Sequence, residues 1–236
     1  MPAKILTVAN DIDVLMAVRT RFDPESYRCK YASTLDEADR MIVLDRPDAV
    51  ILDCDLTADS GVSFLHRLRT STSGRRLPVL LVSKLASEAA CVSALEAGAD
   101  DYLRKPVSSS ELRARVRATL RPYSAFPPVE EISVSGLTIA PVTKRAFRRT
   151  AAGDVSLRLT HGEFQLLHLF LAHPCKVFSR EDVLWKAWGK ETSLDVATVD
   201  VHVCKLRRKL RTVNCADMID TVPGKGYRLV ASTDDL

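Results

Sequence analysis

Short apolar runs alternate with helical periodicities along the first half of the chain. The apolar runs lie at residues 5–8, 27–32, 49–52, 79–82 and 101–104, and the helix-period segments that follow them lie at 14–22, 35–44, 62–68, 88–97 and 110–120. The runs at 49–52 and 79–82 are apolar without alternation, which is typical of central parallel strands covered on both faces. Five strand–helix rounds predict an α/β doubly wound, flavodoxin-like fold with a five-stranded parallel sheet.

The second half of the chain has another order of elements. Residues 121–131 contain three prolines and no helical period, so we expect a linker there, between a domain at 1–120 and a domain at 132–236. Strands are expected at 132–140, 146–149 and 155–159, helices at 161–172, 180–188 and 198–211, and a hairpin after them. This α+β order predicts a second domain whose fold differs from the first.

Charge and composition narrow the class of protein. The formal net charge of +4 comes entirely from the second half, because residues 1–120 carry 17 Lys+Arg against 17 Asp+Glu, and residues 121–236 carry 17 against 13. This asymmetry is typical of a nucleic-acid-binding half joined to a neutral half, although a solvated basic surface has the same composition. The six cysteines lack metal-ligand spacing, and the chain has neither a membrane-length apolar stretch nor a secretion signal. We therefore expect a cytoplasmic protein with reduced thiols and no membrane partner.

Polar side chains follow the predicted strands of the first domain. Asn10 and Asp11 follow the first strand, Asp53 follows the third, Ser83 the fourth and Lys105 the fifth. The carboxyl ends of parallel strands meet at one edge of a sheet, so we expect these side chains to converge. A carboxylate nucleophile beside a hydroxyl and an ammonium that stabilise phosphoryl oxygens is the set that acyl-phosphate chemistry requires.

Three segments of the first domain, VILDCDLTADSG, PVLLVS and GADDYLRKP, together resemble the receiver domain of bacterial response regulators over essentially residues 1–120. The resemblance implies that Asp53 is the phospho-acceptor, Ser83 the switch hydroxyl, Tyr102 the switch aromatic and Lys105 the invariant lysine. It also implies a Mg²⁺ site at Asp53 and at the main-chain carbonyl of Asp55.

The chain departs from this family at the end of its first strand. Receiver domains normally carry an acidic pair where this chain has Ala9 and Asn10, so we expect weak Mg²⁺ binding, with Asp11 as a partial substitute. Two hypotheses stay open: weak or phosphorylation-independent control, or conventional activation at Asp53 by a sensor histidine kinase.

The resemblance also implies a homodimer formed through the receiver. Its face would include the helices at 88–97 and 110–120 and the strand through Tyr102. The candidate interfacial charges are Asp100, Asp101, Glu111 and Arg115. Cys91 occupies a position where the family commonly has a basic partner, so the interface is expected to differ from that of relatives.

The helix at 198–211 has an apolar face and a basic face. Its core anchors recur at steps of four, three and four residues: Val199, Val203, Leu206 and Leu210. The opposite face carries Val201, Cys204, Lys205, Arg208 and, near its edge, Arg211. Lysine and arginine in a major groove contact guanine or phosphate, and valine contacts a thymine methyl group. A solvated basic helix explains the composition equally well.

The hairpin segment IDTVPGKGYRLV favours DNA binding, because its Gly-rich tip exposes Lys225 to the DNA backbone or minor groove. Together with LTHGEFQLLHLFLAHPCKVFSREDVLWKAWG and TVDVHVCKLRRKLR, it resembles the winged helix-turn-helix effector of OmpR/PhoB-type regulators over about residues 132–230. The resemblance implies a recognition helix at 198–211. The DNA-facing positions it implies are Val201, Lys205, Arg207 and Arg208, with Thr221, Lys225 and Tyr227 in or near the wing.

Partners follow from the same resemblance. Promoter DNA is the expected ligand, and Trp188 with residues 189–195 matches the segment that contacts RNA polymerase in activators. Cys204 and Pro223 stand where basic residues are usual, so the target sequence does not transfer from relatives. The alternative from another class is a small-molecule-binding α/β protein or enzyme. The first strand is not followed by a Gly-rich phosphate loop, and no nucleophile–His–acid set stands out, so we expect no enzymatic activity.

Overall fold

The computed structural model describes residues 2–56, 61–85, 87–120, 131–189 and 196–231. The chain divides into two compact units, Met1–Leu120 and Arg121–Leu236. The predicted linker lies outside the described residues except for Glu131, and the predicted polymerase-contact loop lies outside them except for Gly189. Within the described residues, no helix is long and apolar enough to cross a membrane.

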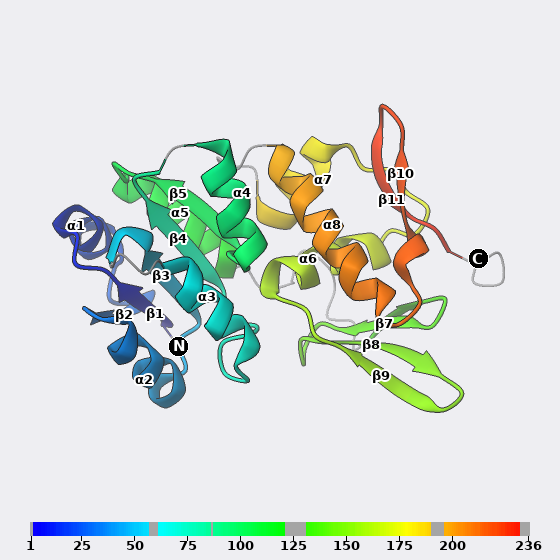
Figure 1. Ribbon diagram of the computed structural model, residues 1–236, viewed down its shortest axis with the longest axis horizontal. Helices are drawn as coiled ribbons and strands as arrows, with labels where there is room; N and C mark the ends of the chain where they lie inside the picture. The colour runs from blue at the N-terminus through cyan, green and yellow to red at the C-terminus, as the bar shows by residue number, and fades with distance from the viewer. Residues whose placement is uncertain (1, 57–60, 86, 121–130, 190–195, 232–236) are drawn as a thin grey trace. The chain divides into compact units, whose positions relative to one another are not determined.

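The first unit is a five-stranded parallel sheet in the order β2-β1-β3-β4-β5, with helices on both faces (Figure 1). Its strands are β1 (Ala3–Val8), β2 (Tyr27–Ala32), β3 (Ala49–Asp53), β4 (Val79–Ser83) and β5 (Asp101–Arg104). Its helices are α1 (Ile12–Arg21), α2 (Leu35–Asp45), the 3₁₀ turn η1 (Cys54–Leu56), α3 (Gly61–Thr70), α4 (Glu88–Ala97) and α5 (Ser109–Leu120). Every residue of β3 and β4 is buried, as expected of strands at the centre of such a sheet. The predicted doubly wound fold is confirmed.

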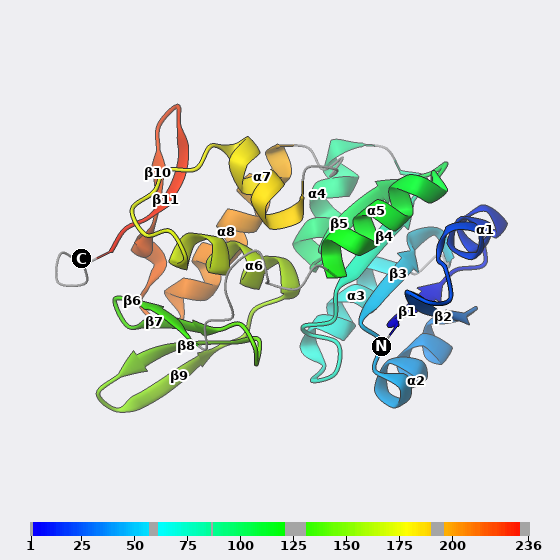
Figure 2. The ribbon, with the colours of Figure 1, turned by 180° about the vertical axis from the view of Figure 1, so that it is seen from behind.

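Local sequence explains where the helices of this unit begin and end. Asp11 caps α1 by accepting from the main-chain N–H groups of Asp13 and Val14, and Thr34 caps α2. Gly98 ends α4 in the left-handed conformation, at a φ of 111°. Seen from behind, α5 lies over the sheet and beside α1 (Figure 2). These connections leave the carboxyl ends of β1, β3, β4 and β5 at a common edge.

The second unit combines a four-stranded antiparallel sheet, three helices and a hairpin. The sheet strands are β6 (Ile132–Val134), β7 (Leu137–Ala140), β8 (Arg145–Thr150) and β9 (Gly153–Leu157). The remaining elements are α6 (His161–Leu171), α7 (Arg180–Trp188), α8 (Ala197–Arg211), the 3₁₀ turn η2 (Ala216–Met218), β10 (Ile219–Val222) and β11 (Gly226–Leu229). Capping boxes begin α6 at Thr160 with Glu163 and α7 at Ser179 with Asp182, as the sequence predicts.

One predicted strand of this unit is wrong in detail. The expected strand at 132–140 is two strands, β6 and β7, which pair antiparallel. The turn between them places Ser135 and Gly136 at φ values of 49° and 76°, a conformation that reverses the chain. The helix-and-hairpin arrangement of the winged helix-turn-helix is otherwise the predicted one.

Candidate functional site

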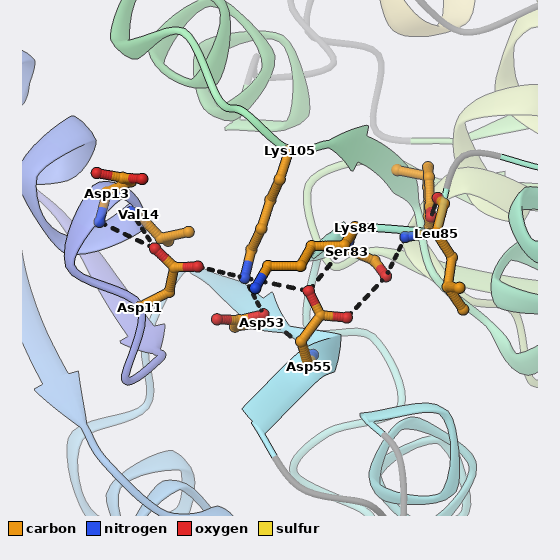
Figure 3. A network of polar contacts seen from close by, with 10 residues as sticks. Asp11, Asp13, Val14, Asp53, Asp55, Ser83, Lys84, Leu85 and Lys105 are labelled. Carbon is orange, nitrogen blue, oxygen red and sulfur yellow. Dashed lines mark hydrogen bonds and ion pairs between the residues drawn. The ribbon is translucent and has the colours of Figure 1, made fainter.

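The predicted strand-end residues of the first unit converge on Lys105. Its ammonium lies 2.8 Å from Asp11 Oδ2, 2.8 Å from Asp53 Oδ1 and 3.2 Å from Asp55 Oδ2 (Figure 3). Asp53 ends β3 and is 2% exposed, whereas the side chains of Asp11 and Asp55 keep 20% and 27% of their surface open. A buried candidate nucleophile therefore lies beside one cation and two partly open carboxylates.

The Asp55 side chain occupies the centre of a second set of contacts. Its Oδ1 accepts from the Ser83 hydroxyl at 3.1 Å, and its Oδ2 accepts from the main-chain N–H of Lys84 at 3.0 Å. Its own main-chain N–H donates to Asp53 Oδ1 at 3.0 Å. Sequence reasoning considered only the carbonyl of Asp55 and missed this side chain, although an acidic residue two places after the acceptor was visible in the sequence.

A chain of hydrogen bonds leads from this set to Tyr102 on β5. The main-chain N–H of Leu85 donates to the Ser83 hydroxyl oxygen at 3.2 Å, and the Tyr102 hydroxyl donates to the Leu85 carbonyl. Burial raises the pKa of Tyr102 above its ordinary value, so its hydroxyl remains a donor at neutral pH. Ser83 and Tyr102 are therefore connected through one residue of the β4–α4 segment.

The charges of the pocket stabilise each other. The hydrogen bond from Lys105, opposed by burial, lowers the pKa of Asp11. Burial opposes the charged form of Lys105, but hydrogen bonds to Asp11 and Asp53 outweigh it and raise the pKa of the ammonium. Burial and then the charges of Asp55 and Asp53 raise the pKa of the neighbouring Cys54 thiol to about 11. That thiol is therefore protonated and weakly reactive at neutral pH.

The candidate dimer charges are paired inside the protomer. Asp100 accepts from Arg69 Nη2 at 2.9 Å, and Asp101 accepts from Arg115 Nη1 at 2.7 and 2.8 Å. Asp100, Asp101 and Arg115 are buried at 2%, 4% and 2% exposure, whereas the Glu111 side chain is 36% exposed. Asp100 is thus joined to α3, and Asp101 to α5, so the ionic groups of these candidate interfacial residues already have partners within the unit.

The helix α8 presents the predicted apolar and basic faces. Its four predicted core anchors are 0–1% exposed. The exposed face carries Cys204, Arg208 and Arg211, with Val201 half-buried beside them. At the wing, Thr221 and Lys225 are exposed, and Lys225 lies in the turn between β10 and β11. These residues form the open basic surface of the second unit.

Three of the predicted DNA-facing residues are not free surface groups. Lys205 is 6% exposed, because it lies on the flank of α8 where Thr198 and His202 are also buried. Arg207 is half-buried and donates to the Ile219 carbonyl at 3.0 Å and to Thr221 Oγ1 at 2.7 Å. It therefore joins α8 to the wing.

Tyr227 is also a structural contact, at 4% exposure. Its hydroxyl donates to Asp200 Oδ1 at 2.7 Å, and Arg180 Nε donates to the same carboxylate oxygen at 2.7 Å. Sequence reasoning missed Asp200 and Arg180, because neither carries a pattern of its own and their meeting depends on how α7, α8 and β11 pack. The wing is thus held to α8 from its base, while its tip is open.

A doubly wound sheet whose carboxyl edge gathers three carboxylates around a lysine, followed in the chain by a winged helix with a basic face, defines a transcription factor of the response-regulator class. The family model for the response regulator receiver domain matches residues 5–117, and the model for the C-terminal domain of transcriptional regulatory proteins matches residues 154–229. The chain belongs to the OmpR/PhoB-type response regulators. It is similar to proteins that control transcription by binding DNA.

Individual relatives cover nearly the whole chain. The phosphate regulon transcriptional regulatory protein PhoB of Escherichia coli (strain K12) is 34% identical, with 97% of this chain and 98% of the relative covered. The response regulator MprA of Mycolicibacterium vanbaalenii is 36% identical, with 97% and 98% covered. A solved RitR mutant has a TM-score of 0.75 at 23% identity, over 98% of this chain and 100% of that one, and supports the fold alone.

Receiver domains typically bind Mg²⁺ at the phosphorylation site. Here the Lys105 ammonium lies among the three carboxylates that would be nearest to such an ion. Among the described residues, no group of three or more His, Cys, Asp or Glu side chains is arranged to hold a metal. At the end of β1, Ala9 is buried and Asn10 is an exposed amide. The donor set in this arrangement does not fit a Mg²⁺ ion.

Proposed function

We propose that this chain binds specific promoter DNA and controls transcription with little or no dependence on phosphorylation of Asp53. One observation carries the second half of this proposal: where receivers carry an acidic pair, β1 is followed by a buried alanine and a neutral asparagine. Asp11, the acid that follows that strand end, already caps α1 and pairs with Lys105. Any Mg²⁺ binding at Asp53 and Asp55 is therefore weak.

Conventional activation at Asp53 is the second candidate. It is favoured by the 2.8 Å contact between Lys105 and Asp53 and by the nearby Ser83 hydroxyl, which are the groups that acyl-phosphate chemistry needs. In that case a sensor histidine kinase is a partner and Asp11 has to help hold the metal. The two candidates differ in whether the unmodified chain binds its operator.

The proposed DNA surface consists of the exposed face of α8 and the tip of the wing. Arg208 is the candidate for base contact, and the other members of this proposed surface are Cys204, Arg211 and Lys225, which are exposed, and Val201, which is half-buried. Replacing Arg208 by alanine is expected to weaken specific binding by roughly 1–3 kcal/mol and to relax specificity at one position.

The buried Lys205 provides a matched comparison, because it lies on the same helix and carries the same charge. Its replacement by alanine is expected to cost less specific affinity than the Arg208 substitution. A larger loss for Lys205→Ala would show that this lysine turns outward to the DNA and reads a base.

Assembly is a further part of the proposal. The proposed homodimer through α4, β5 and α5 would use the half-buried Glu111 at its edge, which pairs with Arg115 at 3.0 Å within the protomer, while Asp101 and Arg115 also satisfy one another. RNA polymerase is the expected partner near Trp188, which is buried in this structure. We place this activity in the cytoplasm and assign the chain no enzymatic turnover.

The decisive experiment selects DNA sequences bound by the unmodified full-length chain from a random double-stranded library. The affinity of the selected site is then measured for the wild type and for Asp53→Asn, each with and without acetyl phosphate and Mg²⁺, and intact mass reports the phosphate adduct. Equal affinities in all four samples support the proposal. Binding that appears only with the adduct, and that Asp53→Asn abolishes, would overturn it in favour of conventional activation.

A further inference from the structure

Three hydrogen-bond donors in the first unit point at one carboxylate. The Ser83 hydroxyl donates to Asp55 Oδ1 at 3.1 Å, while the Lys84 main-chain N–H and the Lys105 ammonium lie 3.0 and 3.2 Å from Asp55 Oδ2 (Figure 3). Both oxygens of Asp55 are therefore engaged. The three donors come from the ends of two neighbouring strands, β4 and β5, so they form a small anion site at the edge of the sheet.

A phosphoryl group on Asp53 would need this same site. Asp53 Oδ1 is already 2.8 Å from the Lys105 ammonium and 3.0 Å from the Asp55 main-chain N–H. The new phosphoryl oxygens would carry about two negative charges and would require donors such as the Ser83 hydroxyl. In this structure the donors are held by a carboxylate whose own charge repels a phosphoryl group beside it.

We propose that the Asp55 carboxylate is a built-in occupant of the phosphoryl-binding site, holding Ser83, Lys84 and Lys105 in place of phosphoryl oxygens. This inference rests on the proposed function, in which the receiver works without phosphorylation of Asp53. The contacts of Asp55 supply a physical reason for that independence. The carboxylate adds a second obstacle to modification that is independent of the weak metal site. The obstacle comes from a residue after β3, whereas the weak metal site is caused by the end of β1.

The internal anion has a consequence beyond the pocket. Because Asp55 fixes the Ser83 hydroxyl, it also orients the oxygen that accepts from the Leu85 N–H. The Leu85 carbonyl in turn accepts from Tyr102. Asp55 is thus linked through Ser83 and Leu85 to the Tyr102 side chain in the unmodified chain.

The test measures how fast Asp53 accepts phosphate when Asp55 is removed. With acetyl phosphate as donor, an Asp53 carboxylate oxygen attacks phosphorus, the bond from phosphorus to the acetyl oxygen breaks, and acetate leaves with that electron pair. The initial rate of adduct formation is followed by intact mass at fixed Mg²⁺ for the full-length wild type, Asp55→Ala and Asp55→Asn. Loss of charge-assisted hydrogen bonds to the competing carboxylate predicts a rate roughly tenfold higher in Asp55→Ala. Asp55→Asn keeps the shape of the side chain and loses its charge, so its rate should lie between those of the wild type and Asp55→Ala.

Controls separate this effect from others. Asp39→Ala removes a carboxylate from the surface of the same unit, where Asp39 pairs with the exposed Arg67, and should leave the rate unchanged. Asp53→Ala combined with Asp55→Ala should give no adduct. Thermal unfolding of each variant identifies a folding defect, and the asparagine variant keeps the comparison valid if the alanine variant unfolds.

An unchanged or lower rate in both folded Asp55 variants overturns the inference, and a lower rate would mean that the carboxylate assists the metal instead of excluding phosphate. The proposed function fails by a separate measurement, loss of operator binding in Asp53→Asn. The two failures are therefore distinguishable.

Discussion

Replacement of Lys105 by methionine is expected to destabilise the first unit by about 3 kcal/mol at neutral pH. The substitution keeps a long side chain but leaves three carboxylates without the cation that lies 2.8–3.2 Å from each of them. Breaking a fully buried ion pair typically costs 3–5 kcal/mol. The value here is placed at the lower end because the Asp11 and Asp55 side chains keep 20% and 27% exposure and remain partly hydrated.

The cost should depend on pH. In the wild type the pKa of Asp11 is lowered, so the stability it contributes is present above its ordinary pKa and is lost only as the pH falls through the lower folded value. Lys105→Met removes the hydrogen bond that is the main cause of the lowered pKa of Asp11. The difference between wild type and variant should therefore stay constant from about pH 7.5 to about 5 and shrink only as the pH falls below the ordinary aspartate pKa of 3.8.

The chain offers an internal reference for this measurement. Both tryptophans lie in α7 of the second unit, so tryptophan fluorescence follows that unit while calorimetry records both transitions. The Lys105→Met substitution should lower the melting temperature of the first unit, which only calorimetry records, and leave the fluorescence transition of the second unit unchanged. Lys30 is a matched control, because it pairs with Asp45 at 2.6 Å on the surface, at 45% exposure, and its loss should cost less than about 1 kcal/mol. Equal costs for Lys105→Met and Lys30→Met, or a cost independent of pH, would refute the reasoning.

Three further predictions concern the second unit. Burial lowers the pKa of His168 to about 4, so the unfolded state binds more protons than the folded state below about pH 6.5. The free energy of unfolding should therefore fall by roughly 2 kcal/mol toward pH 4.5. Urea midpoints followed by tryptophan fluorescence should fall less with pH in His168→Gln than in the wild type. Gly226→Ala would place a Cβ 2.0 Å from the Phe178 carbonyl oxygen at a φ of 130°, which should cost about 4 kcal/mol. Gly153→Ala, at a φ of 118° with no atom within 4 Å of the added Cβ, should cost only about 1–2 kcal/mol. Equal decreases in melting temperature for Gly226→Ala and Gly153→Ala would exclude the clash with the Phe178 carbonyl. Lys225→Ala should reduce the salt dependence of DNA affinity by about one unit of slope, with equal losses on specific and nonspecific DNA; a loss confined to one base position would instead assign Lys225 to base reading.

Much of the first unit was predictable from its sequence. Apolar runs without alternation indicate buried parallel strands, and parallel strands require that residues after β1, β3, β4 and β5 share one edge. The meeting of Asp11, Asp53 and Lys105 follows from that rule alone. The direction of the Asp55 side chain does not, because η1 bends the chain after β3 and determines which donors its carboxylate can reach.

The second unit shows the limit of helical periodicity. A spacing of about 100° per residue assigns the core anchors of α8 correctly, and it also assigns the exposed Arg208. Helical spacing does not predict which residues on the flanks of a helix are covered by neighbouring elements. Lys205 lies on such a flank and is buried, and Arg207 is held by the wing.

The sequence by itself determined the two fold classes, the helix caps and the convergence of strand-end residues, because these depend on local periodicity and on the geometry of parallel sheets. Only the tertiary structure decided the polar pairings that neither a local pattern nor the strand-end rule predicts. The Asp55 contacts with Ser83 and Lys105, the Asp101–Arg115 pair and the Tyr227–Asp200 bond join residues between 14 and 50 positions apart. Such partners depend on packing between elements, and the sequence near either residue carries no trace of it.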